Sequence, residues 1–153
     1  MRYDKIIFCS SDCTYRAPAA AEILKKNISD NKHMDDVVVE AKGMVVLFPE
    51  PVNGKVLAIS RSKGYDLDEY VAESLLETDF DIRHLVIVMT EDSKQKLYDT
   101  YTNAINVYAI KEFVGEQGDI DIPFGGNLAD YGESFSELER IVKLMIAKLE
   151  ELN

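Results

Sequence analysis

Residues 8–18, FCSSDCTYRAP, group the side chains of this chain that are best suited to chemistry on an anion. An apolar run, KIIF, precedes this stretch and a helical pattern, AAAEILKK, follows it. A strand, a tight loop and a helix N-terminus in this order present backbone N–H groups and the positive end of a helix dipole to an anion. Arg16 is suited to bidentate contact with a phosphate, although its position alone fits a solvated surface residue equally well. We therefore predict a phosphate-binding loop made of Ser10, Ser11, Asp12, Cys13, Thr14, Tyr15 and Arg16.

The two cysteines of the chain, Cys9 and Cys13, lie four residues apart, just before this loop and within it. In a reducing compartment such a pair is not expected to form a structural disulfide. A metal site would need further ligands, and the two histidines, His33 and His84, lie far away in sequence. We expect no metal and no cofactor.

The flanking elements alternate between apolar strands and helical patterns. Short β-branched runs predict strands at 3–9, 36–41, 84–90 and, more weakly, 105–110. Helices are predicted at 18–29, 54–64, 68–80, 91–101 and 133–152. Alternation of this kind predicts an α/β fold with a parallel sheet, whose ligands bind at the carboxyl ends of the strands. The loop after the first strand is then the default site.

The length and the net charge of the chain argue against several classes of function. The chain has 153 residues, which suits a single domain over 1–153, and its formal net charge is −11. Duplex nucleic acid and anionic membranes select for basic surfaces, so we expect neither as a partner. No apolar run reaches the roughly 20 residues that span a bilayer, and the acidic N-terminus does not look like a signal peptide, so we expect a cytoplasmic protein. The oligomeric state stays open.

The chain resembles the low-molecular-weight protein tyrosine phosphatases, a family that also includes thioredoxin-coupled arsenate reductases. The family pattern is a strand, then V-C-x-G-N-x-C-R-S-P and a helix, with D-P-[YF] shortly before the last helix. Here residues 9–18 take the first place, and GDIDIPFGGNLADY, residues 118–131, takes the second. The resemblance covers nearly the whole chain in order. It implies a doubly wound, four-stranded parallel sheet flanked by helices.

The departures from the family pattern fall on the residues that perform the reaction. Counted back without a gap from Arg16, the nucleophilic cysteine falls on Ser10; counted from Pro123, the general-acid aspartate falls on Ile122. Such loops lower a thiol pKa from about 8.5 to about 3.5–7.5, whereas a serine hydroxyl ionises at far higher pH. General acid catalysis contributes roughly 10²–10⁴-fold, and isoleucine cannot supply it.

Asp12 and Tyr15 stand where the family has its glycine and its second cysteine. An inward-pointing Asp12 carboxylate would cost on the order of 4 kcal/mol against a bound dianion, and an outward-pointing one far less; the sequence leaves its direction open. We therefore expect a catalytically impaired phosphatase, or pseudophosphatase, that binds phosphate, a phosphotyrosine-containing protein or another protein partner.

The alternative is an active, divergent tyrosine phosphatase. A one-residue insertion would make Cys9 the nucleophile, in C-x6-R, and a second shift would make Asp121 the acid. On a strand, a one-residue shift turns a side chain to the opposite face. In either reading, the resemblance suggests Phe48 and Phe124 as walls of the substrate cleft. No cysteine follows residue 13, which argues against the arsenate-reductase mechanism.

Overall fold

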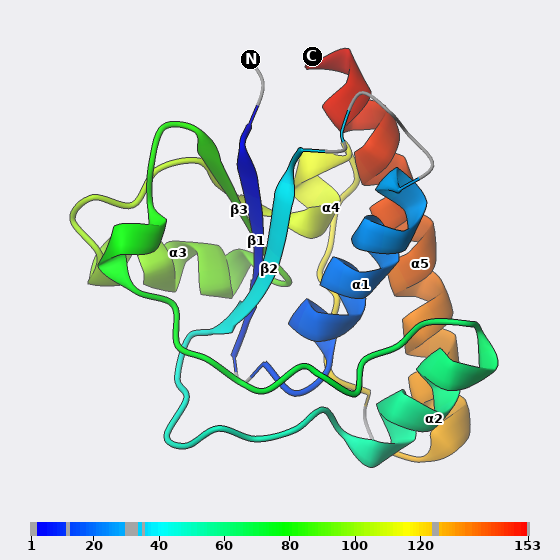
Figure 1. Ribbon diagram of the computed structural model, residues 1–153. Coiled ribbons are helices and arrows are strands. Elements are labelled where there is room, and N and C mark those ends of the chain that lie inside the picture. Colours follow the sequence, from blue (N-terminus) through cyan, green and yellow to red (C-terminus); the bar gives the residue numbers. More distant parts are fainter. Residues whose placement is uncertain (1–2, 12, 30–33, 35, 124–125, 153) are drawn as a thin grey trace.

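The computed structural model describes residues 3–11, 13–29, 34, 36–123 and 126–152 (Figure 1). Four strands form one parallel sheet in the order β2-β1-β3-β4. Their bounds are β1 Lys5–Ser10, β2 Val38–Gly43, β3 His84–Val88 and β4 Val107–Ala109. The four-stranded parallel sheet is therefore confirmed, with β2 beginning and ending about two residues later than predicted.

Helices cover both faces of the sheet. Helices α1 and α5 lie together on one face and α3 lies on the other (Figure 1). The α-helices are α1 Arg16–Ile28, α2 Gly54–Ser62, α3 Glu91–Thr100, α4 Ile110–Phe113 and α5 Leu128–Glu151, and η2 Glu77–Asp79 is a short 3-10 turn. Successive side chains of β1 enter different cores, because strand residues alternate between faces. Ile6 and Phe8 join the core of α1 and α5, whereas Ile7 and Cys9 join the smaller core that contains Leu97 of α3.

The two long helices follow from local sequence. Pro18 lies in the first turn of α1, where its missing N–H leaves no helical hydrogen bond unmade. Helix α5 buries an apolar stripe at helical spacing and begins at residue 128 rather than 133, because the Asn127 side chain caps it by accepting from the Asp130 N–H at 2.8 Å. Among the described residues, no helix combines the length and apolar character needed to cross a bilayer.

The predicted helix at 68–80 is wrong. Residues 71–76 form no helix: Ser74 pairs in parallel with Gly43 at the end of β2, Val71 pairs with Pro51, and the only helical piece of 68–80 is η2. The backbone of this segment bonds elsewhere: Ala72 N–H donates to Glu50 O, and Gly43 N–H donates to Glu73 O, each at 2.8 Å. Ala72 and Leu75 are buried while their neighbours are more exposed. Tertiary hydrogen bonds have therefore overridden the local helical preference.

Candidate functional site

The β1–α1 loop begins at Ser10, the last residue of β1, which stands opposite Gly43 of β2. The Ser10 side chain is 1% exposed. Its Oγ has no hydrogen-bond partner among the described residues. A buried hydroxyl without a partner costs free energy, so native structures rarely keep one. Ser10 is therefore the unusual polar group of this loop.

Cys9 lies on the other side of the strand. It is fully buried, and it belongs to the apolar core that also contains Val88 and Leu97. Burial raises the pKa of the Cys9 thiol well above its usual range, and the nearby Cys13 and Asp79 raise it further. A thiol in such surroundings stays protonated at neutral pH.

The loop turns its carbonyl groups outward. Ser10 O and Ser11 O accept from the N–H groups of Met44 and Val45 at 2.9 and 3.0 Å, and Thr14 O accepts from Asn53 N–H at 2.9 Å. A trans peptide unit directs its N–H opposite to its carbonyl. The Ser11 N–H and the Tyr15 N–H therefore point away from these outer partners, as an anion-binding loop requires.

Cys13 has the left-handed backbone conformation, with φ 65°. Residues other than glycine, asparagine and aspartate rarely adopt it, and a β-carbon there costs about 1 kcal/mol or more. The side chain is 3% exposed. Left-handed residues within a loop help to gather successive N–H groups into an anion-binding concavity. Asp12, next to Cys13, lies outside the described residues.

Arg16 begins α1 and lies between the two segments that the sequence singles out. Its guanidinium is buried, with the residue 6% exposed. Nη1 donates to Ile120 O at 2.8 Å, and Nη2 donates to the Ser11 hydroxyl at 3.1 Å. The cation therefore connects the loop to the 118–131 segment and stands at the positive end of the α1 dipole.

Tyr15 points toward α5. Its hydroxyl is hydrogen-bonded to the Ser134 hydroxyl at 2.6 Å, and its ring packs edge-to-face on Tyr131 with ring centroids 5.4 Å apart. Burial raises the pKa of Tyr15 to about 12. Tyr15 thus contributes its backbone to the loop while its side chain anchors the loop to α5.

The 118–131 segment is held from two directions as it approaches Arg16. The Asp119 carboxylate accepts from Glu91 N–H at the start of α3, at 2.9 Å. Buried Ile120 donates its N–H to Met89 O at 2.8 Å. Beyond it, Asp121 is exposed and Ile122 is 48% exposed. Phe124, the predicted cleft wall, lies outside the described residues.

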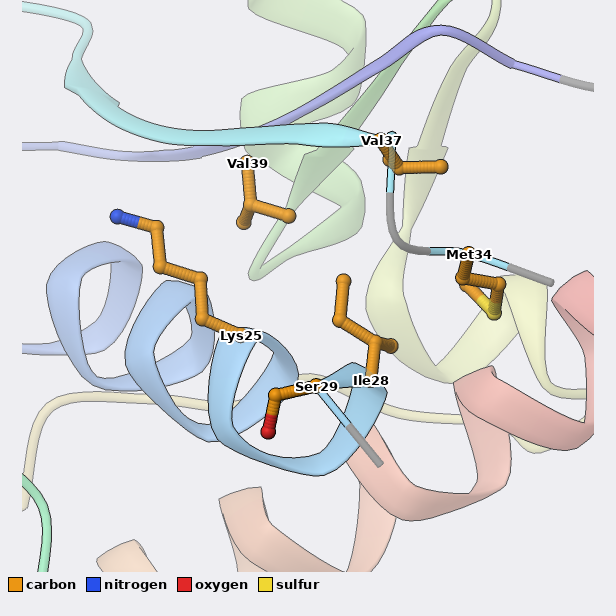
Figure 2. Close-up of a pocket in the computed structure, with 6 residues that line it drawn as sticks. All are labelled: Lys25, Ile28, Ser29, Met34, Val37 and Val39. Carbon is orange, nitrogen blue, oxygen red and sulfur yellow. The ribbon is translucent and has the colours of Figure 1, made fainter. Parts of the chain in front are cut away.

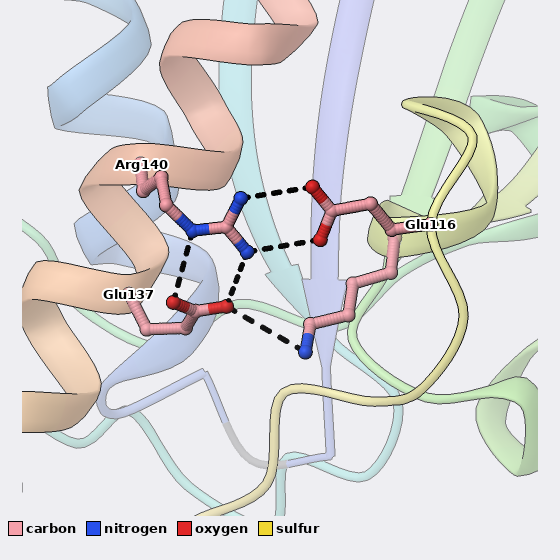
Figure 3. Close-up of polar contacts among 4 residues, drawn as sticks. Glu116, Glu137 and Arg140 are labelled. Atoms are coloured by element: carbon pink, nitrogen blue, oxygen red, sulfur yellow. Dashed lines mark hydrogen bonds and ion pairs between the residues drawn. The ribbon is translucent and has the colours of Figure 1, made fainter.

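A network of charged side chains attaches the preceding turn to α5 (Figure 3). The Arg140 guanidinium forms a bidentate pair with Glu116, at 2.8 and 2.9 Å, and a second pair with Glu137. Lys111 Nζ lies 3.6 Å from Glu137. Exposed ion pairs contribute little stability singly, but bidentate geometry and shared partners fix orientation. The network therefore fixes the path of the chain before Asp119.

Phe48 lies in a segment that starts at the loop itself, because Met44 and Val45 hold the Ser10 and Ser11 carbonyls. Phe48 is 62% exposed and its neighbour Leu47 is 87% exposed. A large exposed aromatic side chain is available to contact a ligand or a partner.

A separate hollow lies at the far end of α1, between that helix and β2 (Figure 2). Four of its lining residues are apolar, Ile28, Met34, Val37 and Val39, and the other two are Lys25 and Ser29. The Lys25 ammonium already donates to the Tyr70 hydroxyl at 2.7 Å. With a mostly apolar lining and a lysine that is already engaged, this hollow is a poorer candidate for binding a phosphoryl group than the β1–α1 loop.

Of the predicted residues, the structure joins Ser11 to Arg16 by a hydrogen bond and places Ser10 next to Ser11 at the end of β1. Cys9 and Tyr15 pack into the two cores. Sequence reasoning missed the partners that hold the loop. Ile120 acts through its carbonyl, which carries no side-chain signal, and Ser134 lies 119 residues from Tyr15. Neither contact leaves a pattern in the sequence.

Comparison with known proteins identifies the family of this chain. The profile of the family "Low molecular weight phosphotyrosine protein phosphatase" matches residues 5–153. The low molecular weight protein-tyrosine-phosphatase PtpB of Staphylococcus haemolyticus is 30% identical over 135 residues, which cover 88% of this chain and 91% of that protein.

Two solved structures share the fold with a TM-score of 0.86 and 27% identity. The low molecular weight protein tyrosine phosphatase of T. tengcongensis is matched over 95% of this chain and 99% of its own. The other is a cysteine-to-serine mutant of the YwlE arginine phosphatase with a phosphorylated active-site serine, matched over 95% of both chains. This chain belongs to the low molecular weight phosphotyrosine protein phosphatase family.

Proposed function

We propose that this protein binds a phosphorylated protein side chain in the 10–16 loop and hydrolyses it far more slowly than active members of its family. The proposal depends chiefly on the position and the surroundings of Ser10. Counted from Arg16, it occupies the nucleophile position of the family motif. Its Oγ is buried and has no hydrogen-bond partner among the described residues. A polar group in that state is suited to meet a ligand atom.

The rest of the loop supports phosphate binding. Arg16 supplies a cation at the N-terminus of α1, and the outer hydrogen bonds of the Ser10 and Thr14 carbonyls leave the Ser11 and Tyr15 N–H groups directed the other way. Cys13 keeps the left-handed conformation despite its steric cost. The YwlE mutant described above, which carries phosphate on an active-site serine, supports the expectation that this fold accommodates a phosphoryl group beside a serine.

Slow turnover follows from the chemistry of two side chains. A serine hydroxyl needs a neighbouring base to become a nucleophile, whereas a thiol in such a loop ionises without one. At the general-acid position, Ile122 has no proton to give. Both halves of the family reaction are therefore weakened, while the contacts that hold a phosphoryl group remain.

The competing proposal, in which Cys9 attacks and Asp121 donates the proton, has less support. Cys9 lies in the core with Val88 and Leu97, on the face of β1 opposite to the one that carries Phe8. Burial also keeps its thiol protonated. For the Cys9 side chain to reach the loop, β1 would have to shift its register against both neighbouring strands. That shift would break six residue pairs with β2 and five with β3.

The test separates binding from turnover. Inorganic phosphate at ten times its Kd should stabilise the protein by about 1.4 kcal/mol, which raises Tm by roughly 3–5 °C for a chain of this size. Arg16→Ala should abolish this shift, and Arg83→Ala, which alters an exposed cation paired with Asp4 at the opposite end of the sheet, should keep it. With p-nitrophenyl phosphate we expect no sustained turnover. Hydrolysis at the rate of an active relative, lost in Arg16→Ala, would refute the proposal.

A further inference from the structure

Ser10 combines three features that a phosphoryl acceptor needs. Its hydroxyl is 1% exposed and finds no partner among the described residues. It stands in the same loop as Ser11 and Arg16, whose guanidinium is oriented by the Ser11 hydroxyl and by Ile120 O. It also precedes the N-terminus of α1, a helix of 13 residues. A dianion on Ser10 would meet the helix dipole and the buried cation together.

We propose that Ser10 is a covalent modification site: it takes the phosphoryl group from the bound side chain and retains it as phosphoserine. This inference rests on the proposed function, because the donor must first occupy the loop. The protein would then act as a single-use phosphoryl acceptor, and its phosphorylated form would be a lasting state.

The transfer balances without an external reagent. Ser10 Oγ forms a bond to phosphorus as the bond from phosphorus to the leaving atom breaks, and the electron pair stays on that atom. The Oγ proton passes to a non-bridging phosphoryl oxygen and from there to water, and the leaving atom takes a proton from water, so protons balance. A phosphotyrosine donor yields tyrosine, and a phosphoarginine donor yields arginine. Because water protonates the leaving atom, the step proceeds without an acid at Ile122, at a correspondingly lower rate.

Positioning can drive this step even though serine is a weak nucleophile. Well-oriented groups react with effective concentrations of about 10⁵–10⁸ M, and the loop would hold phosphorus next to Oγ. Donors with the better leaving groups should react first. Both candidate donors share the phosphoryl group that the loop recognises, so the experiment must distinguish them.

Phosphoserine at position 10 should persist because its hydrolysis has neither a good leaving group nor a general acid or base at position 122. Hydrolysis of phosphoserine expels an alkoxide, a far poorer leaving group than a thiolate. Water would have to be activated at the position of Ile122, which is apolar and 48% exposed. Uncatalysed hydrolysis of phosphate monoesters is among the slowest reactions known. The same loop that accepts the phosphoryl group therefore releases it far more slowly.

The experiment uses intact-protein mass spectrometry with peptide mapping. Unphosphorylated protein is incubated separately with a phosphotyrosine peptide, a phosphoarginine peptide and inorganic phosphate, and the donor is then removed. We expect the mass of one phosphoryl group on Ser10 with at least one peptide and none with inorganic phosphate. The peptide that labels identifies the donor. The label should survive hours without donor and withstand acid, which cleaves phosphorus–nitrogen bonds.

The controls are matched serines. Ser10→Ala should lose the label, whereas Ser29→Ala, at the exposed opposite end of α1, should keep it. The labelled protein should also no longer gain Tm from inorganic phosphate, because its site is filled. A label that remains in Ser10→Ala, or that disappears as soon as the donor is removed, would overturn the inference.

The phosphate thermal shift separates this inference from the function on which it rests. An Arg16-dependent shift without any label would overturn the phosphoserine and leave the proposed binding function standing. Absence of both the shift and the label would overturn both.

Discussion

Replacing Ser10 by alanine should make the unliganded protein more stable. The Ser10 hydroxyl is buried at 1% exposure and has no hydrogen-bond partner among the described residues. Such a group costs about 1–3 kcal/mol, because it loses its hydrogen bonds to water on folding and gains none in return. Alanine keeps the β-carbon and removes the hydroxyl. Stability would then rise at the same position where the phosphoryl label is lost.

The expected change in unfolding free energy is the difference between the desolvation cost that is removed and the packing contacts that are lost. Removal of one oxygen forfeits a few contacts of about 0.1–0.2 kcal/mol each, which is small beside the desolvation cost. We expect Ser10→Ala to gain about 1 kcal/mol, or roughly 2–4 °C in Tm for a chain of this size. The measurement is urea unfolding in phosphate-free buffer, on protein shown by mass to carry no phosphate.

Ser60 provides the matched control. It is equally buried, but its hydroxyl donates to Leu57 O at 2.9 Å. Ser60→Ala should therefore lose about 0.5–1.5 kcal/mol, the usual net value of one hydrogen bond. The two substitutions are chemically identical and should shift the unfolding midpoint in opposite directions. If Ser10→Ala destabilises the protein as Ser60→Ala does, Ser10 is a structural residue and the reasoning about the site fails.

Three further predictions concern the same loop. Iodoacetamide should label Cys9 only after unfolding, because burial raises its pKa; rapid labelling of the native protein, read by mass, would favour Cys9 as a nucleophile. Ser10→Cys combined with Ile122→Asp should restore p-nitrophenyl phosphate hydrolysis relative to either single variant, and a double variant no faster than the singles would contradict the gapless register. Burial raises the pKa of Tyr15 to about 12, above the unfolded value near 10, so its contribution to stability is present below pH 10 and lost toward pH 12. Tyr15→Phe should therefore show a shallower loss of unfolding free energy over that range in urea titrations; equal slopes would refute it.

The sequence predicted the fold because local patterns and tertiary structure agree over most of the chain. The apolar run at 84–88 and the stripe of α5 each indicate the element that forms. Agreement fails at 68–80, where a helical pattern is overridden by backbone hydrogen bonds to Gly43 and Glu50. No window of local sequence contains these partners, so no periodicity could have revealed them.

The candidate site likewise has some features that the sequence predicts and others that it does not. Alternation along β1 is a local property, so the prediction that Cys9 and Ser10 face opposite sides could be made from the sequence. The contacts that orient the site could not, because they join distant segments. The Arg16 guanidinium bonds to a carbonyl 104 residues away, and the Tyr15 hydroxyl bonds to Ser134, 119 residues away.

The energetic cost of the loop is itself informative about its function. Cys13 in the left-handed conformation and the unpartnered Ser10 hydroxyl each cost about 1 kcal/mol or more. In a protein whose total stability is about 5–15 kcal/mol, two such costs in one short loop are large. A loop kept only as a connection would be more stable with alanine at position 10 and asparagine or glycine at position 13. The energetic cost of this loop therefore supports the proposal that its shape and its open hydroxyl serve to meet a ligand.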